Sequence, residues 1–473
     1  MHVIAVDLGA SNGRVMKCTY NGGFNLEEVH RFPNVPLQKK YLHWNIQQLW
    51  RNTIKGVDWA SEGAQSIGLD SWGVDFGLLD AQGNLLEDPV HYRDPRTKDV
   101  MKWVFKRIPR REIFEKTGVQ FLELNTLYQL ASLSRRRKRF LGEAATYLGF
   151  PDLFNYWLTG EKRAEYTHAT TTQCYNPSNG CWDEEILSAI DVPFDLFPSI
   201  VYPGEVLGTI GDINVSIPSC HDTGSAVVAV PSTDNVYCYL SSGTWSLMGT
   251  ETKKPVITDE VYKQNFTNEG GVEGTNRLLK NLPGLWFEQE LMREWTSKGS
   301  LVRHEDLYQL ASGVQAFRSV INPADARFLP PGDMTPRIAE YCRDHGETVP
   351  VSMGEHIRCV YDSLALSYLK CLGELESLMG ESYPVIHVIG GGSLNRFLNQ
   401  LTADITRRKL VAGPVEAAAL GNSIMQYRCI GLLDSIGEAR RILGETLDLV
   451  EYYPESGLEW ENAYSRYQSL ITQ

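Results

Sequence analysis

The 473-residue sequence lacks any apolar stretch close to the roughly 18 consecutive residues that a membrane-spanning helix needs. Met1 and His2 lead directly into an apolar run, without the cationic segment and cleavage site of a secretory signal. The G-x-x-x-x-G-K-[ST] motif is also missing, which excludes a P-loop NTPase. From these absences we expect a cytoplasmic protein with no membrane partner.

Basic residues are in the minority, with Lys+Arg 45 against Asp+Glu 58 and a formal net charge of -13. A field of this sign repels nucleic acids and anionic membranes. The basic run Arg135–Arg139 is the exception, and we interpret it as a solvated helix face. We therefore predict no nucleic-acid partner.

The nine cysteines form no C-x-x-C pair and no cluster with zinc-ligand spacing. Cys174 and Cys181 are close enough in sequence to meet in space, as are Cys342 and Cys359. Free buried thiols are nevertheless the common outcome in a reducing compartment. We interpret the cysteines as thiols without a redox role.

The length and the 42% hydrophobic content fit a globular protein of two large domains. Strand-like apolar runs alternate with helical patterns, which favours an α/β fold whose sheets are covered by helices. We predict a boundary near residue 230, with an N-terminal domain over 1–230 and a C-terminal domain over 231–473.

The opening "VIAVDLGASNGRVMKCTY" predicts a β-hairpin. Its first strand is the apolar run Val3–Val6, and its second alternates apolar and polar residues from Met16 to Tyr20. The segment "VYCYLSSGTWSLMGT", residues 236–250, repeats this design. Alignment on the glycines puts Gly9 opposite Gly243, which indicates duplication of a whole domain.

Glycine-rich hairpin tips leave backbone N–H groups unpaired, so two of them can hold a polyphosphate. In the glycine alignment Asp7 falls opposite Ser241, and Ala10 falls opposite Thr244. A carboxylate at position 7 can hold a hydrated Mg²⁺ against phosphates. The alternative for Asp7 is a side chain that only caps the turn.

Two further segments place polar or small residues at helix starts. "HDTGSAVVAV" puts Asp222 at the N-terminus of a small-residue helix, whose dipole favours the ionised carboxylate, and the alternative is a plain N-cap. "GGGSLN", residues 390–395, predicts a strand-to-helix junction with Ser393 as N-cap and Leu394 on the apolar helix face. Such a junction can seat a nucleotide or simply allow close packing.

"GASNG" also matches G-x-S-x-G, the nucleophile elbow of serine hydrolases. That motif requires a strand followed by a helix, whereas here an alternating strand follows. A hydrolase is therefore disfavoured.

Many short motifs along the chain are similar to those of one family. They are "VDLGASNGR", "DSWGVDFGLLD", "YRDPRT", "NTLYQL", "TTTQ", "HDTGSAV", "YLSSGTWSLMG", "TNEGG", "KNLPGLW", "HVIGGGSLN" and "AGPVEAAALGN". Together they resemble the FGGY carbohydrate kinases, in that family's order, from about residue 3 to residue 430. The resemblance implies two actin-like, ribonuclease H-like domains, each an α/β unit with a mixed sheet covered by helices, and an active site in the interdomain cleft.

The resemblance also implies residue roles. Asp222 would be the catalytic base, and Asp7 would lie near the metal. The sugar contacts would be Gly73, His221, Asp222, Thr223 and Asn281, with Trp72, Asp75, Arg93 and Asp94 as further pocket members. The nucleotide contacts would be Ala10, Ser11, Asn12, Gly13, Arg14, Thr244, Gln289, Gly391 and Gly392. Ala10 departs from the threonine of many members and removes one hydroxyl donor to phosphate.

Within the family, the motifs imply ATP- and Mg²⁺-dependent phosphorylation of the primary 1-hydroxyl of L-rhamnulose, as in rhamnose catabolism. L-Fuculose or another deoxyketose is the alternative substrate, since a few pocket side chains decide one hydroxyl's configuration. A nucleotide-dependent sugar sensor without turnover is the alternative outside enzymes. The expected partners are therefore a small sugar and ATP, and we expect a monomer or a small homo-oligomer.

Overall fold

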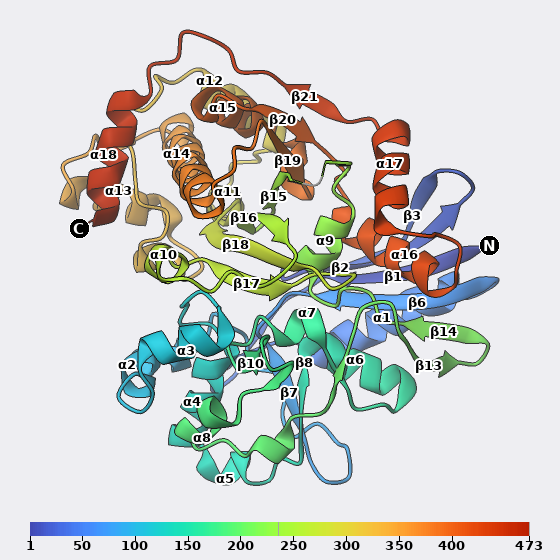
Figure 1. Ribbon diagram of the computed structural model, residues 1–473. Helices are drawn as coiled ribbons and strands as arrows, with labels where there is room; N and C mark the ends of the chain where they lie inside the picture. Colours follow the sequence, from blue (N-terminus) through green and yellow to red (C-terminus); the bar gives the residue numbers. More distant parts are fainter. Residues whose placement is uncertain (235, 473) are drawn as a thin grey trace. The chain divides into compact units, whose positions relative to one another are not determined.

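The computed structural model describes residues 1–234 and 236–472 (Figure 1). These residues fall into two compact units. The first unit comprises residues 1–233, 251–279 and 416–447, and the second comprises residues 234–250, 280–415 and 448–473. Two later segments of the chain, residues 251–279 and 416–447, return to the first unit. The division into domains 1–230 and 231–473 stays a prediction.

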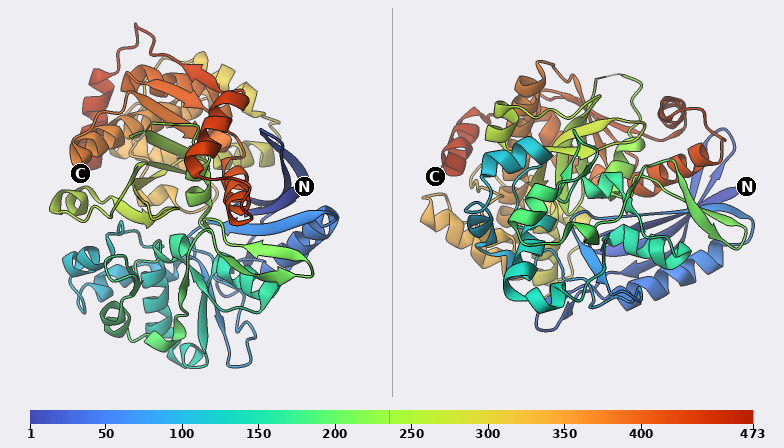
Figure 2. Two further views of the ribbon diagram at one scale, coloured as in Figure 1. Left: turned by 45° about the vertical axis from the view of Figure 1, so that its right-hand side comes forward. Right: turned by 60° about the horizontal axis from the view of Figure 1, so that its bottom comes forward.

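The first unit is built on a six-stranded mixed sheet. Its strands, in spatial order, are β13 (Val206–Ile210), β14 (Ile213–Ser216), β6 (Ala64–Ser71), β1 (His2–Leu8), β2 (Asn12–Tyr20) and β3 (Phe24–Pro33). Strand β1 pairs antiparallel with β2 and parallel with β6, and the blue strands β1 to β3 can be followed in both views of Figure 2. The predicted opening hairpin is confirmed.

Helices cover both faces of this sheet. Ile4 and Val6 of β1 pack in one cluster with Leu49 of α1 (Ile46–Ala60), whereas Ala5 packs with Ala419 of α16 (Ala417–Cys429). Successive side chains of a strand point to opposite faces, so α1 and α16 lie on opposite sides of β1 (Figure 1). Burial on both faces explains why Val3–Val6 is a continuous apolar run.

The rest of the first unit consists of short elements and a hairpin. The strands are β4 (Leu37–Gln38), β5 (Leu42–His43), β7 (Phe76–Leu79), β8 (Thr146–Gly149), β9 (Ala164–Glu165), β10 (Tyr175–Asn176), β11 (Cys181–Trp182), β12 (Ile200–Val201), β17 (Thr267–Gly270) and the start of β18 (Asn276–Pro283). The helices are α2 (Val100–Val104), α3 (Arg110–Thr117), α4 (Thr126–Arg136), α5 (Lys138–Leu141), α6 (Phe150–Thr159), α7 (Tyr166–Ala169), α8 (Glu184–Ala189), α9 (Asp222–Val228), α10 (Asp259–Gln264) and α17 (Ile436–Thr446). The 3-10 turns are η1 (Pro95–Thr97) and η2 (Phe194–Leu196).

The second unit repeats the hairpin and its parallel neighbour. Strands β16 (Trp245–Thr252), β15 (Cys238–Ser242), β19 (Val385–Ile389), β20 (Lys409–Ala412) and β21 (Val450–Tyr452) lie side by side in that order. Strand β15 pairs antiparallel with β16 and parallel with β19, as β1 does with β2 and β6. The predicted second hairpin is therefore confirmed.

Helices of the second unit include the long α14, labelled in Figure 1. They are α11 (Trp286–Ser297), α12 (His304–Ser312), α13 (Met334–Asp344), α14 (Met353–Met379), α15 (Arg396–Thr406) and α18 (Glu461–Thr472), with 3-10 turns η3 (Ala326–Phe328) and η4 (Gly391–Leu394). A capping box begins α14, since Ser352 Oγ accepts from the Glu355 N–H and Glu355 Oε2 accepts from the Ser352 N–H.

The helix start predicted at Ser393 is wrong by two residues. Residues 391–394 form the 3-10 turn η4, and the side chain of Asn395 caps α15 by accepting from the Leu398 N–H at 2.9 Å. Ser393 Oγ donates instead to the Gly390 carbonyl. The extra turn rotates Leu394 away from the apolar helix face, and its side chain is exposed.

Three other expectations can be compared with the fold. All nine cysteines are free thiols. Within the described residues, no helix combines the length and the apolar composition needed to cross a membrane. In the basic run, Arg137 makes a two-pronged ion pair with Glu87 at 2.7 and 2.9 Å.

Candidate active site

The tip of the first hairpin presents unpaired backbone N–H groups. Gly9 N–H donates to the Asn12 carbonyl at 2.9 Å, and Asn34 fixes the tip by donating to the carbonyls of Ser11 and Gly9. Within the described part of the chain, the N–H groups of Ala10 and Ser11 donate to no protein acceptor. The carbonyls are therefore used by the protein while two amides stay available for an anion.

A partly buried ion pair closes the base of this tip. Asp7 and Arg14 are cross-strand partners on β1 and β2, and Asp7 Oδ2 accepts from Arg14 Nε at 3.0 Å and from Nη2 at 2.6 Å. Glu416 Oε2 lies 2.8 Å from Arg14 Nη1. Burial lowers and the two carboxylates raise the pKa of Arg14, with a net rise, so the guanidinium stays charged.

Asp70 adds a third carboxylate, which sequence reasoning missed. It lies beside Asp7 in the parallel register of β1 and β6, and it is fully buried. Its Oδ2 accepts from Asn422 Nδ2 at 2.6 Å, whereas Oδ1 is buried without a hydrogen-bond partner. Burial raises the pKa of Asp70 well above its ordinary range, and the charges of Asp7 and Asp222 raise it further.

Asp222 occupies the first position of α9, as predicted, with His221 as the preceding cap residue. The small residues of this helix have a packing reason. A Cβ at Gly421 of α16 would come 1.8 Å from the Ser225 carbonyl oxygen, so α9 and α16 meet through glycine at backbone distance. This contact fixes the start of α9 against the sheet that carries Asp7 and Asp70.

The Asp222 carboxylate is held through one of its two oxygens. Oδ1 accepts from the Thr223 N–H at 2.5 Å and from Thr223 Oγ1 at 3.2 Å, and His221 Nε2 lies 3.5 Å from the same atom. Burial raises the pKa of Asp222, His221 opposes the rise, and Asp7 adds to it. Across the described residues Oδ2 takes part in no hydrogen bond or ion pair, which leaves that oxygen for a substrate hydroxyl.

His221 belongs to a second layer of buried polar groups. Its N–H donates to Thr167 Oγ1 at 3.1 Å, and Thr167 in turn donates to Glu165 Oε2 at 2.7 Å. The ring nitrogen Nδ1 lies 3.2 Å from both Arg277 Nη2 and Glu269 Oε2. Glu269 stands in the recognised "TNEGG", but no sequence signal singles out Arg277 or Glu165.

The predicted sugar-pocket residues Trp72, Gly73 and Asp75 lie together after β6. Asp75 is fully buried, and its Oδ2 accepts from Trp72 Nε1 at 3.0 Å and from Trp44 Nε1 at 2.6 Å. Burial raises the pKa of Asp75 to about 6, and these hydrogen bonds oppose the rise. Gly73 is packed on Thr171, because an added Cβ would lie 3.0 Å from Thr171 Oγ1.

Of the remaining pocket candidates, Asp94 is a buried cap. Its Oδ1 accepts from the Arg96 N–H at 2.9 Å, and its Oδ2 accepts from the Leu42 N–H at 2.7 Å. Arg93 follows Tyr92 and stacks its guanidinium over that ring at 5.3 Å. Sugar contacts by these residues stay predictions.

The second hairpin tip carries the other predicted nucleotide residues. Thr244 Oγ1 lies 3.3 Å from Gln289 Oε1, so the structure brings these two together. Gly284 of "KNLPGLW" touches the tip: an added Cβ would lie 2.6 Å from the backbone carbon of Trp245. The Leu285 N–H also donates to the Gly243 carbonyl at 2.8 Å.

Gly391 and Gly392 lie in the same unit, after β19. Gly392 is close to the end of β15, since an added Cβ would lie 2.0 Å from Ser242 Oγ. A Cβ added at Gly391 would have no atom within 4 Å. Nearby, Glu288 accepts from Tyr361 Oη at 2.5 Å and from Asn395 Nδ2 at 3.2 Å.

Asn281 lies on β18 and is partly exposed. The geometry of the second unit thus groups Thr244 with Gln289, and Gly392 with the strand that precedes their tip.

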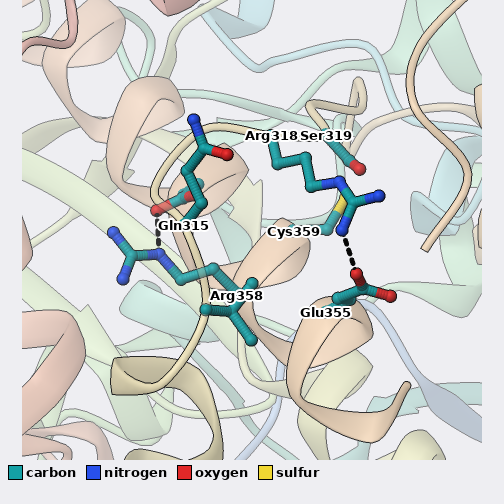
Figure 3. Close-up of a pocket in the computed structure, with 8 residues that line it drawn as sticks. Gln315, Arg318, Ser319, Glu355, Arg358 and Cys359 are labelled. Atoms are coloured by element: carbon teal, nitrogen blue, oxygen red, sulfur yellow. Dashed lines mark hydrogen bonds and ion pairs between the residues drawn. The ribbon is translucent and has the colours of Figure 1, made fainter. Parts of the chain in front are cut away.

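A small pocket elsewhere in the second unit contains none of the predicted residues (Figure 3). It is lined by Val314, Gln315, Arg318, Ser319, Glu355, Arg358, Cys359 and Asp362. Its two arginines are both engaged, Arg318 with Glu355 and Arg358 with Asp362. We do not include it in the site.

Solved structures of other proteins share the fold of this chain. A xylulose kinase from Lactobacillus acidophilus superimposes with a TM-score of 0.77 at 17% identity, covering 100% of this chain and 96% of that one. A Plasmodium falciparum glycerol kinase with ADP gives a TM-score of 0.75 at 14% identity, covering 100% and 97%. The shared fold is that of the two-domain, actin-like sugar kinases.

Sequence comparison narrows the class. The model of the N-terminal domain of the FGGY family of carbohydrate kinases matches residues 2–217, and that of the C-terminal domain matches residues 238–429. The chain therefore belongs to the FGGY family of carbohydrate kinases. Among curated relatives, a Bacteroides thetaiotaomicron protein named rhamnulokinase is 42% identical over 99% of each chain, and one from Oceanobacillus iheyensis is 40% identical over 95% of this chain and 97% of the relative.

Proposed function

We propose that this kinase transfers the γ-phosphoryl group of ATP to the primary 1-hydroxyl of L-rhamnulose, giving L-rhamnulose 1-phosphate. The relatives named rhamnulokinase support this substrate, because the similarity extends over nearly the whole chain. The observation that carries the chemistry is the Asp222 carboxylate, whose Oδ1 is held while Oδ2 stays open.

Asp222 acts as the general base. The transition state of phosphoryl transfer is loose, so positioning and charge compensation supply most of the rate enhancement. A base near the attacking hydroxyl contributes typically about 10²- to 10⁴-fold. Because burial raises the pKa of Asp222, its carboxylate accepts the sugar proton more readily than an exposed aspartate would.

His221, Thr223, Gly73 and Asn281 contact the sugar in this proposal, with Trp72 and Asp75 shaping the pocket. Asp75 shapes the pocket without contacting the sugar, because indole and amide donors already occupy both of its carboxylate oxygens. Its partner Trp72 is then the side chain that meets the sugar.

Each hairpin tip has a role in nucleotide binding in this proposal. In the first unit, the free N–H groups of Ala10 and Ser11 and the tip residues through Arg14 hold phosphate oxygens. In the second unit, the nucleotide contacts are Thr244, Gln289, Gly391 and Gly392. Ala10 offers no hydroxyl, so position 10 binds phosphate through its backbone N–H group.

The carboxylates of the first unit fit a Mg²⁺ ion. Asp7 and Asp222 each raise the pKa of Asp70, so the group carries excess negative charge that a divalent cation compensates. In the described chain no three His, Cys, Asp or Glu side chains form a metal cage. Mg²⁺ is usually held by one or two carboxylates together with substrate phosphates, and Asp7 is the ligand we assign. When bound, it would neutralise charge on the transferred group.

A panel of ketoses assayed by coupled ADP release tests the proposal. We expect the highest kcat/KM with L-rhamnulose. A higher value with L-fuculose would make this a kinase for that sugar. ATP binding without ADP release at saturating L-rhamnulose would instead identify a sugar sensor. A cytoplasmic location, the absence of nucleic-acid and membrane partners, and a monomeric or small homo-oligomeric state stay predictions.

A further inference from the structure

The imidazole ring of His221 lies between the proposed base and a buried ion pair. On one side, Nε2 is 3.5 Å from Asp222 Oδ1. On the other, Nδ1 is 3.2 Å from Arg277 Nη2 and 3.2 Å from Glu269 Oε2. Arg277 Nη2 and Glu269 Oε2 are themselves 3.2 Å apart, so the three groups form a triangle behind the ring.

The fold holds this triangle rigidly. Glu269 and Arg277 are cross-strand partners on β17 and β18, and the Arg277 side chain is fully buried. Arg277 Nε donates to the Gly270 carbonyl at 2.9 Å, which fixes the plane of the guanidinium. A Cβ at Gly224 would lie 3.3 Å from Arg277 Nη2, so the glycine gives the guanidinium room beside the start of α9.

The guanidinium decides where the ring proton sits. Arginine keeps its charge and offers only donors, so a ring nitrogen that is hydrogen-bonded to Arg277 accepts. Of the two contacts of Nδ1, the one with Arg277 has hydrogen-bond geometry, whereas the one with Glu269 is an ion-pair distance. His221 Nδ1 is that nitrogen, which leaves the proton of the neutral ring on Nε2. The Nε2–H group then faces Asp222 Oδ1 as a donor.

We propose that Arg277 and Glu269 are positioning residues for phosphoryl transfer, acting through the tautomer of His221; this rests on the proposed role of Asp222. His221 and Thr223 together place donors around Oδ1. The carboxylate is thereby oriented with Oδ2 toward the sugar hydroxyl. Glu269 compensates the buried charge of Arg277, since an unpaired buried guanidinium is costly.

Loss of Arg277 has a specific consequence. Without the guanidinium, Nδ1 faces only the Glu269 carboxylate, which is an acceptor and draws the proton to Nδ1. The lone pair of Nε2 then faces Asp222 Oδ1, and the two acceptors repel each other. Arg277→Met should therefore switch the tautomer of His221 and release the Asp222 carboxylate from its orientation.

Nitrogen-15 NMR of the full-length protein with labelled histidine tests the inference without any kinetic assumption. The signals of His221 are assigned from those that disappear in His221→Asn. We expect the Nε2–H tautomer in the wild type and the Nδ1–H tautomer in Arg277→Met. An Nδ1–H tautomer in the wild type would overturn the inference, whether or not the protein releases ADP with L-rhamnulose.

Kinetics give a second test with a matched control. Arg277→Met should lower kcat about 10- to 100-fold, as expected when a reacting group is displaced, with KM for ATP unchanged. Glu269→Gln should keep the tautomer and lose less. Arg358→Met is the control, because it removes a guanidinium from another ion pair of low exposure, Arg358–Asp362, that touches no proposed site residue.

Equal losses of kcat in Arg277→Met and Arg358→Met would contradict a positioning role. If Arg277→Met does not fold, the tautomer of His221 in the wild-type protein still tests the inference. Absence of ADP release from wild-type protein with any ketose would refute the proposed function, and the NMR result would stand apart from it.

Discussion

The two glycine hairpins share a backbone design and differ in charge. In the first, Asp7 and Arg14 face each other across the strands, and Glu416 joins them. In the second hairpin, the residue that aligns with Asp7 is Ser241. The contact at its tip is between two neutral side chains, Thr244 and Gln289. The two hairpins thus share a pairing pattern, whereas the Asp7–Arg14 ion pair belongs to the first.

From this difference we expect the two units to have different tasks. The first unit gathers the three carboxylates Asp7, Asp70 and Asp222, which suits charge compensation and proton transfer. The second unit offers hydroxyl, amide and glycine backbone, which suits hydrogen bonding to a nucleotide. Removal of charge from the first unit should therefore affect kcat, and changes in the second should affect KM for ATP.

The largest effect is expected for Asp222→Asn. The amide keeps the size of the side chain and can still accept from Thr223, but it cannot take a proton. We expect kcat to fall at least about 100-fold with ATP affinity unchanged, measured by ADP release and by nucleotide titration. A near-normal kcat in this variant would show that Asp222 is not the catalytic base.

The same variant should be more stable. Burial raises the pKa of Asp222, so its ionised form disfavours folding at neutral pH. The Tm of Asp222→Asn should exceed that of the wild type above the raised pKa. The difference should narrow as the pH falls through that pKa and vanish below the ordinary pKa of aspartate. A lower Tm at neutral pH would contradict this reading of the site.

Asp7→Asn tests the charged hairpin. It weakens the pair with Arg14 and removes the charge assigned to Mg²⁺. We expect kcat to fall about 10- to 100-fold and the Mg²⁺ concentration for half-maximal rate to rise, because charge compensation supplies much of the catalysis. Ser241→Ala, at the matching position of the second hairpin, should leave the Mg²⁺ requirement unchanged. If the rate depended on Mg²⁺ equally in both variants, the two hairpins would not differ in charge compensation.

Gly284→Ala tests how the second tip is held. An added Cβ would overlap the backbone of Trp245, so the tip must move. We expect the free energy of unfolding to fall by about 1–3 kcal/mol, as for other overpacking changes, and KM for ATP to rise. Gly243→Ala is the matched control for stability, since its nearest neighbour would be 3.9 Å away. Equal stability of the two variants in urea titrations would contradict the close packing of Gly284 against the tip.

The smallest effect is expected for Thr244→Val. It removes the hydroxyl that faces Gln289 while keeping the branched shape. The loss of one hydrogen bond, about 0.5–1.5 kcal/mol, corresponds to a rise of about 2- to 12-fold in KM for ATP with kcat nearly unchanged. A drop in kcat with constant KM would instead indicate that Thr244 acts in the phosphoryl-transfer step.

Local patterns predicted the elements of the fold well. Both hairpins and the position of Asp222 at a helix start follow from strand alternation and the placement of glycines and small residues. The start of α15 was misplaced because a 3-10 turn lies between β19 and the helix, and Ser393 and Asn395 are equally plausible caps in sequence.

The supporting residues of the site could not be predicted in the same way. Asp70 meets Asp7 only through the parallel register of two strands far apart in sequence. Arg277 reaches His221 from a hairpin 56 residues further along the chain. Such contacts depend on tertiary packing, and neither periodicity nor turn chemistry encodes them.

The central claim is that Asp222 Oδ2 receives the proton of the sugar hydroxyl. A crystal structure with a non-hydrolysable ATP analogue and L-rhamnulose tests it most directly. We predict Asp222 Oδ2 at about 2.6–3.2 Å from the 1-hydroxyl oxygen, with Oδ1 still bound to Thr223. An ordered sugar whose 1-hydroxyl lies beyond hydrogen-bonding reach of both Asp222 oxygens would contradict the account.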